Sequence, residues 1–323
     1  MKRLGWPSVL RVDRYIMAIL AMVALASVLP VHGGAAEAVG LATKAAIGLL
    51  FFLYGGRLSR QAVVAGLTHW RLQLTVLAST FVLFPLLSWG LSLAFRAWLG
   101  PELAFGLLFL AFLPSTVQSS IAFTSIARGN IPAAICAASL SNLAGVVITP
   151  AMVALIASRH GTGFSSGTLK AILMQLLAPF ALGQALRPLT AGWLERNRRI
   201  LGLVDRGAIL LVVYSAFSAG MVAGIWHQVD LTRLGLLIAI CALLLALMLA
   251  ANTYLSRRLG FSTEDEVTVV FCGSKKSLAS GLPMANILFT AHSVGLIVLP
   301  LMLFHQIQLM VCAHIARRYA RRE

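Results

Sequence analysis

The sequence has 323 residues, of which 59% are hydrophobic and only 11% are charged, and its net charge is +16. Soluble domains carry about 25% charged residues, so this composition excludes an ordinary soluble protein and predicts an all-α integral membrane protein. The basic residues fall in short loops between apolar runs, which is typical of membrane topology signals and not of a nucleic-acid-binding protein.

Ten segments are apolar and long enough to span a bilayer, which takes about 20 residues. The first resembles a signal peptide, but similar runs follow it throughout the chain, so we interpret it as an uncleaved span. In chain order the predicted transmembrane helices are residues 15–31, 39–56, 72–95, 103–127, 131–158, 168–187, 207–226, 233–256, 266–290 and 293–316.

The distribution of Lys and Arg predicts the orientation of these spans. If the N-terminus is cytoplasmic, most basic residues lie in segments on the cytoplasmic side, and only Arg96, Arg159, Lys170 and Arg233 lie in outside loops. The positive-inside rule then predicts cytoplasmic N- and C-termini. We expect a multi-pass protein of the plasma (inner) membrane.

Spans four and nine share an unusual feature. Each is interrupted by a polar stretch rich in Gly, Pro and Ser, "LPSTVQSS" at 113–120 and "FCGSKKSLASGLP" at 271–283. Five spans lie in residues 1–160 and five in 161–323, and an odd number per half places the halves upside down relative to each other. Paired discontinuous helices that cross in such inverted repeats indicate the midplane site of a transporter. The alternative is that Pro114 and Pro283 only kink ordinary helices.

Lys275 and Lys276 lie deep in span nine. At 1.5 Å per residue, Lys275 is roughly 13 Å beyond Glu266 at the predicted entry of the span, near the middle of a core about 30 Å thick. A lysine at a helix centre costs about 2.5–3.5 kcal/mol, so we expect at least one of the two to face a polar cavity. Snorkelling is the alternative. Lys44, in span two, is left open between the cavity and the interface.

All ten carboxylates lie outside the spans or at their ends. The fixed charge at the breaks is therefore positive, which favours a small anionic substrate.

We expect no cofactor and no metal site; membrane lipid is the other expected partner, and the oligomeric state is open. Ser141 adds a hydroxyl near the first break. The candidate substrate- or ion-binding residues are Pro114, Ser115, Thr116, Gln118, Ser119, Ser120, Ser139, Asn142, Gly273, Ser274, Lys275, Lys276 and Ser277.

The break "PSTVQSS" and the segment "SLSNL" at 139–143 resemble the bile acid:sodium symporter family. The break "FCGSKKSL" resembles its divergent sodium-bile-acid-symporter-like branch, and the likeness covers residues 15–316. The resemblance implies a core domain of spans three to five and eight to ten, and a panel domain of spans one, two, six and seven.

The resemblance also implies candidate sodium ligands. Ser119 and Ser120 occupy the places of a Ser-Asn pair in sodium-coupled relatives, and Ser139 and Asn142 are the candidates in span five. A ligating Glu of those relatives is replaced here by Phe271, and a Gln of the second sodium site by Lys275. A lysine ammonium in this place could stand in for the sodium charge, which leaves Na+ open as coupling ion.

The hypothesis that follows is a secondary active transporter of a small organic anion that works by alternating access. The alternative is a membrane regulator or scaffold that keeps a transporter fold without transporting. An enzyme is not expected, because His305 and His314 in the last span have no carboxylate near them in the sequence.

Overall fold

The computed structural model describes residues 14–57, 69–159, 166–222, 224, 230–289 and 291–322. Within these ranges the chain forms helices and no strand, which confirms the predicted all-α class. The helices are α1 (Arg14–Val28), α2 (Gly33–Arg57), α4 (Trp70–Ala78), η2 (Ser79–Leu83), α5 (Phe84–Leu99), α6 (Pro101–Phe112), α7 (Gln118–Ile126), α8 (Ile131–Arg159), α9 (Ser166–Ala185), α10 (Arg187–Arg196), α11 (Arg198–Val222), α12 (Leu231–Arg258), α13 (Thr263–Gly273), α14 (Leu278–Leu288) and α15 (Ala291–Ala320).

Several of these helices can cross a membrane unaided. Among the described residues, six are long and apolar enough, counting α4, η2 and α5 as one continuous helix. They are Gly33–Arg57, Trp70–Leu99, Ile131–Ile156, Arg198–Val222, Leu231–Arg258 and Val294–Ala320. The ten-span topology and the inverted relation of the halves 1–160 and 161–323 stay predictions, as does the division into core and panel domains.

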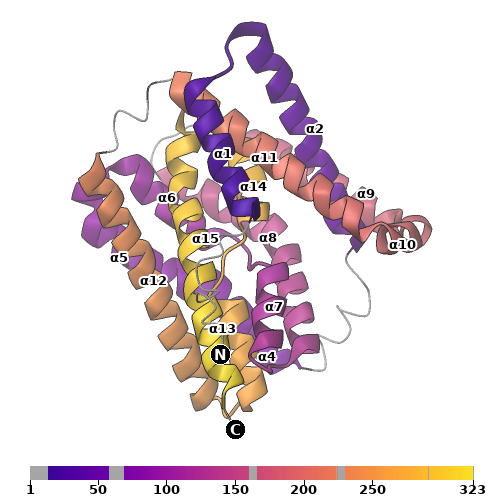
Figure 1. Ribbon diagram of the computed structural model, residues 1–323, viewed down its shortest axis with the longest axis vertical. Coiled ribbons are helices and arrows are strands. Elements are labelled where there is room, and N and C mark those ends of the chain that lie inside the picture. Colours follow the sequence, from indigo (N-terminus) through magenta and orange to yellow (C-terminus); the bar gives the residue numbers. More distant parts are fainter. Residues whose placement is uncertain are drawn as a thin grey trace, which may run out of the picture.

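Predicted spans four and nine are each built from two shorter helices. α6 and α7 cover the first, and α13 and α14 the second, with polar residues between them (Figure 1). None of the four pieces reaches the length of about 20 residues that a span needs. The predicted interruptions are confirmed, and kinked continuous helices are excluded.

Two features escaped the sequence reading. α10 lies where a connecting segment is predicted. Its Leu194 is buried in a cluster with Leu201 and with Leu53, which is remote in the sequence, and a hydropathy pattern cannot reveal such a contact. Within the third span, η2 is a π-helical turn, a feature that is rare and is often found at functional sites.

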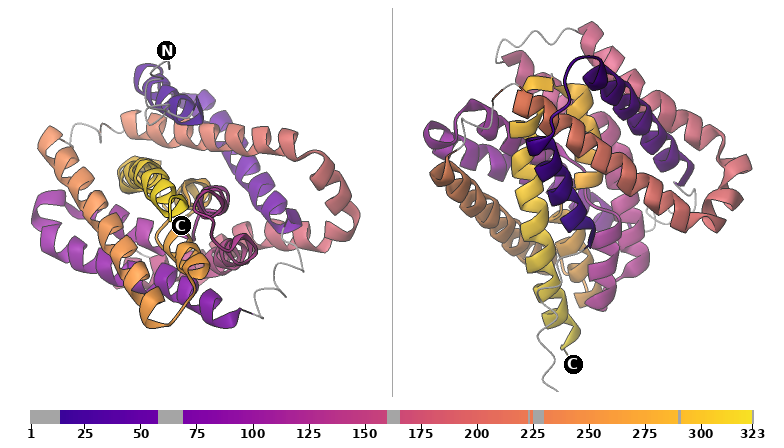
Figure 2. Two further views of the ribbon diagram at one scale, coloured as in Figure 1. Left: turned by 60° about the horizontal axis from the view of Figure 1, so that its bottom comes forward. Right: turned by 45° about the horizontal axis from the view of Figure 1, so that its top comes forward.

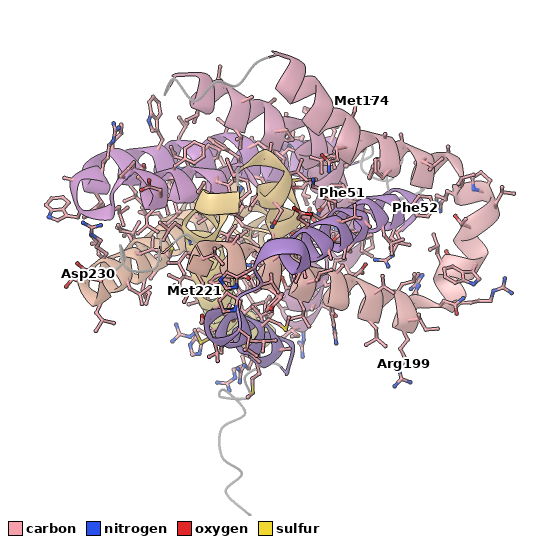
Figure 3. All side chains as sticks on the ribbon, turned by 90° about the horizontal axis from the view of Figure 1, so that it is seen from above. Phe51, Phe52, Met174, Arg199, Met221 and Asp230 are labelled. Atoms are coloured by element: carbon pink, nitrogen blue, oxygen red, sulfur yellow. The ribbon has the colours of Figure 1, made fainter. Side chains whose placement is uncertain are left out.

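The contact between α2 and α9 is unusually close. A Cβ atom added to Gly55 on α2 would lie 2.0 Å from the carbonyl oxygen of Phe180, and one added to Gly183 on α9 would lie 1.9 Å from that of Phe52. Figure 3 shows Phe51 and Phe52 on α2 beside α9. Small residues let membrane helices approach in this way, so the two glycines fix this pair of helices.

α15 lies inside the bundle. It packs against α6, α11, α12 and α14, and Figure 2 shows it (yellow) surrounded by the other helices. Phe304 on α15 is fully buried and meets Phe84 edge to face, with ring centroids 5.5 Å apart. α15 therefore packs against three of the four pieces of the broken helices, α6, α7 and α14.

Candidate functional site

The site lies where the two broken helices meet. The first break (residues 113–117) joins α6 to α7, and the second (residues 274–277) joins α13 to α14. A proline disfavours helical backbone at the residue before it, and Leu113, which precedes Pro114, is extended, with φ −72° and ψ 152°. Pro114 therefore ends α6.

The two breaks touch directly. The backbone N–H of Ser277 in the second break donates to the carbonyl of Pro114 in the first, at 2.9 Å. In return, the hydroxyl of Ser115 donates to the carbonyl of Cys272 at the end of α13, at 2.6 Å. The last carbonyls of a helix have no partner within it, so each broken helix satisfies backbone groups of the other.

Asn142 on α8 ties the first break to α14. Its Nδ2 donates to the carbonyl of Ser115 at 2.9 Å, and its Oδ1 accepts from the hydroxyl of Ser280 at 3.0 Å. The neighbouring hydroxyl of Ser141 accepts from the backbone N–H of Ser115 at 2.9 Å. Of the two serines that the sequence offered in this span, Ser141 therefore contacts the break, and Ser139 is half-buried on α8.

Hydroxyl groups cluster at the start of α7. Thr116 Oγ1 lies 2.7 Å from Ser119 Oγ and 3.1 Å from Ser120 Oγ. Ser120 also donates to the carbonyl of Phe271, at 3.2 Å. Gln118, at the first position of α7, is exposed. The candidates of the first break are thus close together, and Gln118 is the one that faces outward.

Lys276 joins the first break to the third span. Its side chain is fully buried, and its ammonium donates to the carbonyls of Thr80 at 2.8 Å, Ala111 at 2.6 Å and Leu113 at 2.7 Å. An ammonium has three N–H donors, so all three are used. The carbonyl end of α6 also carries partial negative charge. The ring centroid of Phe84 lies 4.2 Å from the same nitrogen.

Lys275 points to the other side of the second break. Its ammonium donates to the carbonyl of Ser119 at 2.8 Å and lies 3.9 Å and 5.2 Å from the ring centroids of Phe123 and Phe271. Both lysines are fully buried. The sequence predicted that at least one of them faces a polar cavity; in this structure the ammonium groups meet carbonyl oxygens and aromatic faces, because the break lets adjacent residues reach opposite partners.

In the part of the chain that the structure describes, no salt bridge joins either ammonium group to a carboxylate. Among the described residues, the salt bridges involve only Asp205 and Glu266 as acids. A buried charge is costly unless it is paired or hydrogen-bonded. Here carbonyl oxygens and aromatic faces are the partners of both lysines, and an anionic partner is what the site lacks.

Gly273 and Ser274 shape the second break. Ser274 bonds back to the carbonyl of Val270 at 2.5 Å. A Cβ on Gly273 would lie 3.0 Å from both Asn252 Nδ2 and Ser79 Cβ, so a larger residue would press against the Asn252 amide. Within the described residues, neither amide atom of the buried Asn252 has a hydrogen-bond partner. Asn252 and Ser79 therefore lie beside the second break, which the sequence did not predict.

Gln308 on α15 was also missed. It is fully buried, accepts from the backbone N–H of Lys276 at 2.9 Å and donates to its carbonyl at 3.0 Å. Its Nε2 also lies 2.8 Å from Nδ1 of His305. Two glutamines in an otherwise apolar span, Gln306 and Gln308, were a usable signal in the sequence. Lys44 is exposed on α2 and takes no part in these contacts.

Ser277 caps α14, and its removal should be measurable. Its hydroxyl accepts from the backbone N–H of Ser280 at 3.2 Å. Replacing an N-cap serine by alanine costs about 1 kcal/mol and by glycine only a few tenths. We expect Ser277→Ala to lower the melting temperature in detergent by about 2–4 °C, and Ser277→Gly by less. Ser125→Ala, at an exposed site on α7, is the control; equal shifts in all three variants would contradict the capping role.

Comparison with known proteins places this chain among membrane transporters. A sequence model of the SBF-like CPA transporter family (DUF4137) matches residues 13–321. The chain is 49% identical over 313 residues to "Putative symporter YfeH" of Escherichia coli, covering 96% of this chain and 93% of that protein.

Two further relatives extend the comparison. A Pseudomonas aeruginosa protein, "Uncharacterized protein PA2026", is 57% identical over 312 residues, covering 96% of this chain and 93% of its own. "Sodium/bile acid cotransporter 7" of Rattus norvegicus is 27% identical over 310 residues, covering 93% and 90%. The likeness in each case spans both breaks.

Proposed function

Because this chain belongs to the SBF-like CPA transporter family, we propose that it is a secondary transporter of a small organic anion. The family is one of membrane transporters and not of enzymes, and the apolar helices make the chain a multi-pass membrane protein. The finer proposal places it in the inner membrane with both termini in the cytoplasm, as the basic loops predict.

The observation that carries the proposal is the pair of buried ammonium groups at the meeting point of the breaks. They are buried basic groups with no carboxylate partner among the described residues, and in this proposal they are positively charged when an anion is bound. A carboxylate, sulfonate or phosphate brought to the breaks would complete the charge balance. A cationic or neutral solute would gain nothing from them.

We place the anion at the first break. α7 begins without a side-chain cap, so its first backbone N–H groups are available to an anion, which the helix dipole also favours. Gln118 is exposed there, and the ammonium of Lys275 binds the carbonyl of Ser119 in the same turn. In this proposal Lys275 moves from that carbonyl to the substrate when the anion enters.

Lys276 then takes the place of a coupling cation. Unwound carbonyls and the C-terminal ends of half-helices coordinate the coupling ion in other transporters with broken helices. In this chain the ammonium of Lys276 is held by two such carbonyls, those of Ala111 and Leu113, and by the carbonyl of Thr80 in η2. Phe271 stands where sodium-coupled relatives have Glu. We propose that transport proceeds by alternating access about the two breaks and needs no sodium gradient.

Uptake into proteoliposomes tests the proposal. A panel of labelled organic anions, including a bile salt, is offered with and without an inward sodium gradient. We expect uptake of at least one anion without sodium. We expect Lys275→Gln to reduce that uptake at least tenfold, because the variant loses one charge contact with the substrate, and a tenfold change corresponds to about 1.4 kcal/mol. The control is Lys44→Gln, which changes an exposed lysine on α2.

The other outcomes are equally informative. Uptake that depends on sodium and survives Lys275→Gln would overturn the role of the lysines. Saturable binding of an anion without any flux would support the alternative, a non-transporting regulator that keeps the transporter fold.

A further inference from the structure

The end of the molecule formed by α12, α13 and α15 holds a cavity away from the two breaks. Its volume is about 350 Å³. The lining residues are Leu249, Ala250, Thr253, Tyr254, Arg257, Val270, Ile315 and Tyr319. Ala250, Tyr254 and Arg257 are exposed, so the cavity opens to the outside of the bundle.

The cavity has an apolar end and a cationic end. Leu249 and Arg257 lie eight residues apart on α12, about 12 Å along the helix. The walls near Leu249 and Val270 are aliphatic, whereas Arg257, Tyr254 and Tyr319 line the other end. This polarity matches an amphiphile with a charged head.

Two further arginines lie over the tyrosines of the cavity. The guanidinium of Arg258 lies 5.1 Å from the ring centroid of Tyr254, and that of Arg322 lies 3.9 Å from that of Tyr319. Both arginines are exposed. Arg258 Nε also donates to Tyr254 Oη at 3.0 Å. These contacts hold the two guanidinium groups beside the cavity, and each guanidinium has five N–H donors, so further donors can meet an anion.

The acids at this end of the molecule are fewer than its exposed arginines: Glu264, Asp265 and Glu266 lie in the first turn of α13. Glu266 is buried and accepts from Arg257 Nε at 2.9 Å and from Tyr319 Oη at 2.8 Å. Arg322 reaches it only at 3.9 Å. More arginines lie on the same ends of α12 and α15, so the surface around the mouth is cationic. The exposed arginines of these two ends are Arg257, Arg258, Arg317, Arg318, Arg321 and Arg322.

We propose that this cavity binds an anionic phospholipid, with its phosphate at Arg258 and Arg322 and the start of an acyl chain along Leu249 and Val270. The positive-inside rule puts these arginines on the cytoplasmic side, where the leaflet is anionic and basic pockets between transmembrane helices bind lipid headgroups. The bound lipid bridges α12, α13 and α15, and α13 leads directly into the second break.

Lipid titration of the purified, delipidated full chain tests this proposal. Native mass spectrometry measures binding of dioleoylphosphatidylglycerol and of dioleoylphosphatidylcholine. We expect the anionic lipid to bind at least about tenfold more tightly, and the double change Arg258→Gln with Arg322→Gln to remove that preference while leaving phosphatidylcholine binding unchanged. Arg199→Gln, which changes an exposed arginine at the far rim of the molecule (Figure 3), is the control and keeps the preference.

A second pair of variants tests the apolar part of the cavity. Ala250→Phe fills the cavity from an exposed helix position and should weaken binding of both lipids about tenfold. Ala246→Phe lies one turn earlier on α12, is equally exposed and does not line the cavity, so it should change nothing. Melting curves of all variants verify folding.

Three results overturn the proposal: equal affinity for the two lipids, a preference that survives the double arginine change, or competition by soluble glycerophosphoglycerol as strong as that by intact lipid. The last result would mean that the cavity holds a headgroup or free phosphate and that the apolar walls are unused.

Discussion

Lys276→Ala is expected to lower the melting temperature of the detergent-purified protein by roughly 10 °C in buffer without sodium. The change leaves the carbonyls of Thr80, Ala111 and Leu113 without their donors, and each unsatisfied buried group costs about 1–3 kcal/mol. Removing a buried charge recovers part of this, so we expect a net loss of about 3 kcal/mol, which at about 2–4 °C per kcal/mol gives the stated shift. Differential scanning fluorimetry measures it.

The effect of sodium distinguishes the loss of hydrogen bonds to the three carbonyls from the loss of side-chain packing alone. Three carbonyl oxygens are ligands of the kind that bind monovalent cations in channels, and alanine leaves space beside them. We therefore expect NaCl, compared with choline chloride at equal ionic strength, to restore part of the stability of Lys276→Ala and to leave the natural protein unchanged. Lys44→Ala, at an exposed site, should melt like the natural protein. A Lys276→Ala variant with unchanged melting and uptake would show that the ammonium does not hold the breaks together.

Gly183→Ala is expected to separate α2 from α9 and to prevent a stable fold. The new Cβ would lie 1.9 Å from the carbonyl oxygen of Phe52 and 2.8 Å from its carbonyl carbon. These are backbone atoms, so no rotamer change relieves the overlap and the helices must move apart along their contact. Membrane helices associate largely through close packing, and we expect a fall in melting temperature of more than about 10 °C, or loss of the monodisperse peak in size-exclusion chromatography.

Gly48 provides the matched control for this change. It lies on the same helix α2 as Gly55, and a Cβ added to it would meet nothing within 4 Å. Alanine is favoured over glycine inside a helix by about 1 kcal/mol, so Gly48→Ala should leave the melting temperature unchanged or raise it slightly. Gly55→Ala should behave like Gly183→Ala. If Gly55→Ala and Gly183→Ala melt like Gly48→Ala, the close contact of α2 and α9 is wrong.

The sequence by itself determined the class of the protein and the position of its breaks. Few charges and long apolar runs leave the backbone no partner but itself, so helices follow from composition alone. Pro114 and the glycines around the two lysines are local signals that act within a few residues. They placed both interruptions correctly, and the motifs around them indicated the transporter family that the comparisons show.

Only the tertiary structure decided what the polar side chains of the site contact. Lys276 binds the carbonyl of Thr80, which is 196 residues away, and Asn142 bonds to Ser280, 138 residues away. The π-helical turn η2 and the glycine contact of α2 with α9 likewise depend on neighbours remote in the chain. A hydropathy pattern records how apolar a position is, but a hydrogen bond depends on distance and direction between atoms, and these exist only once the helices have packed.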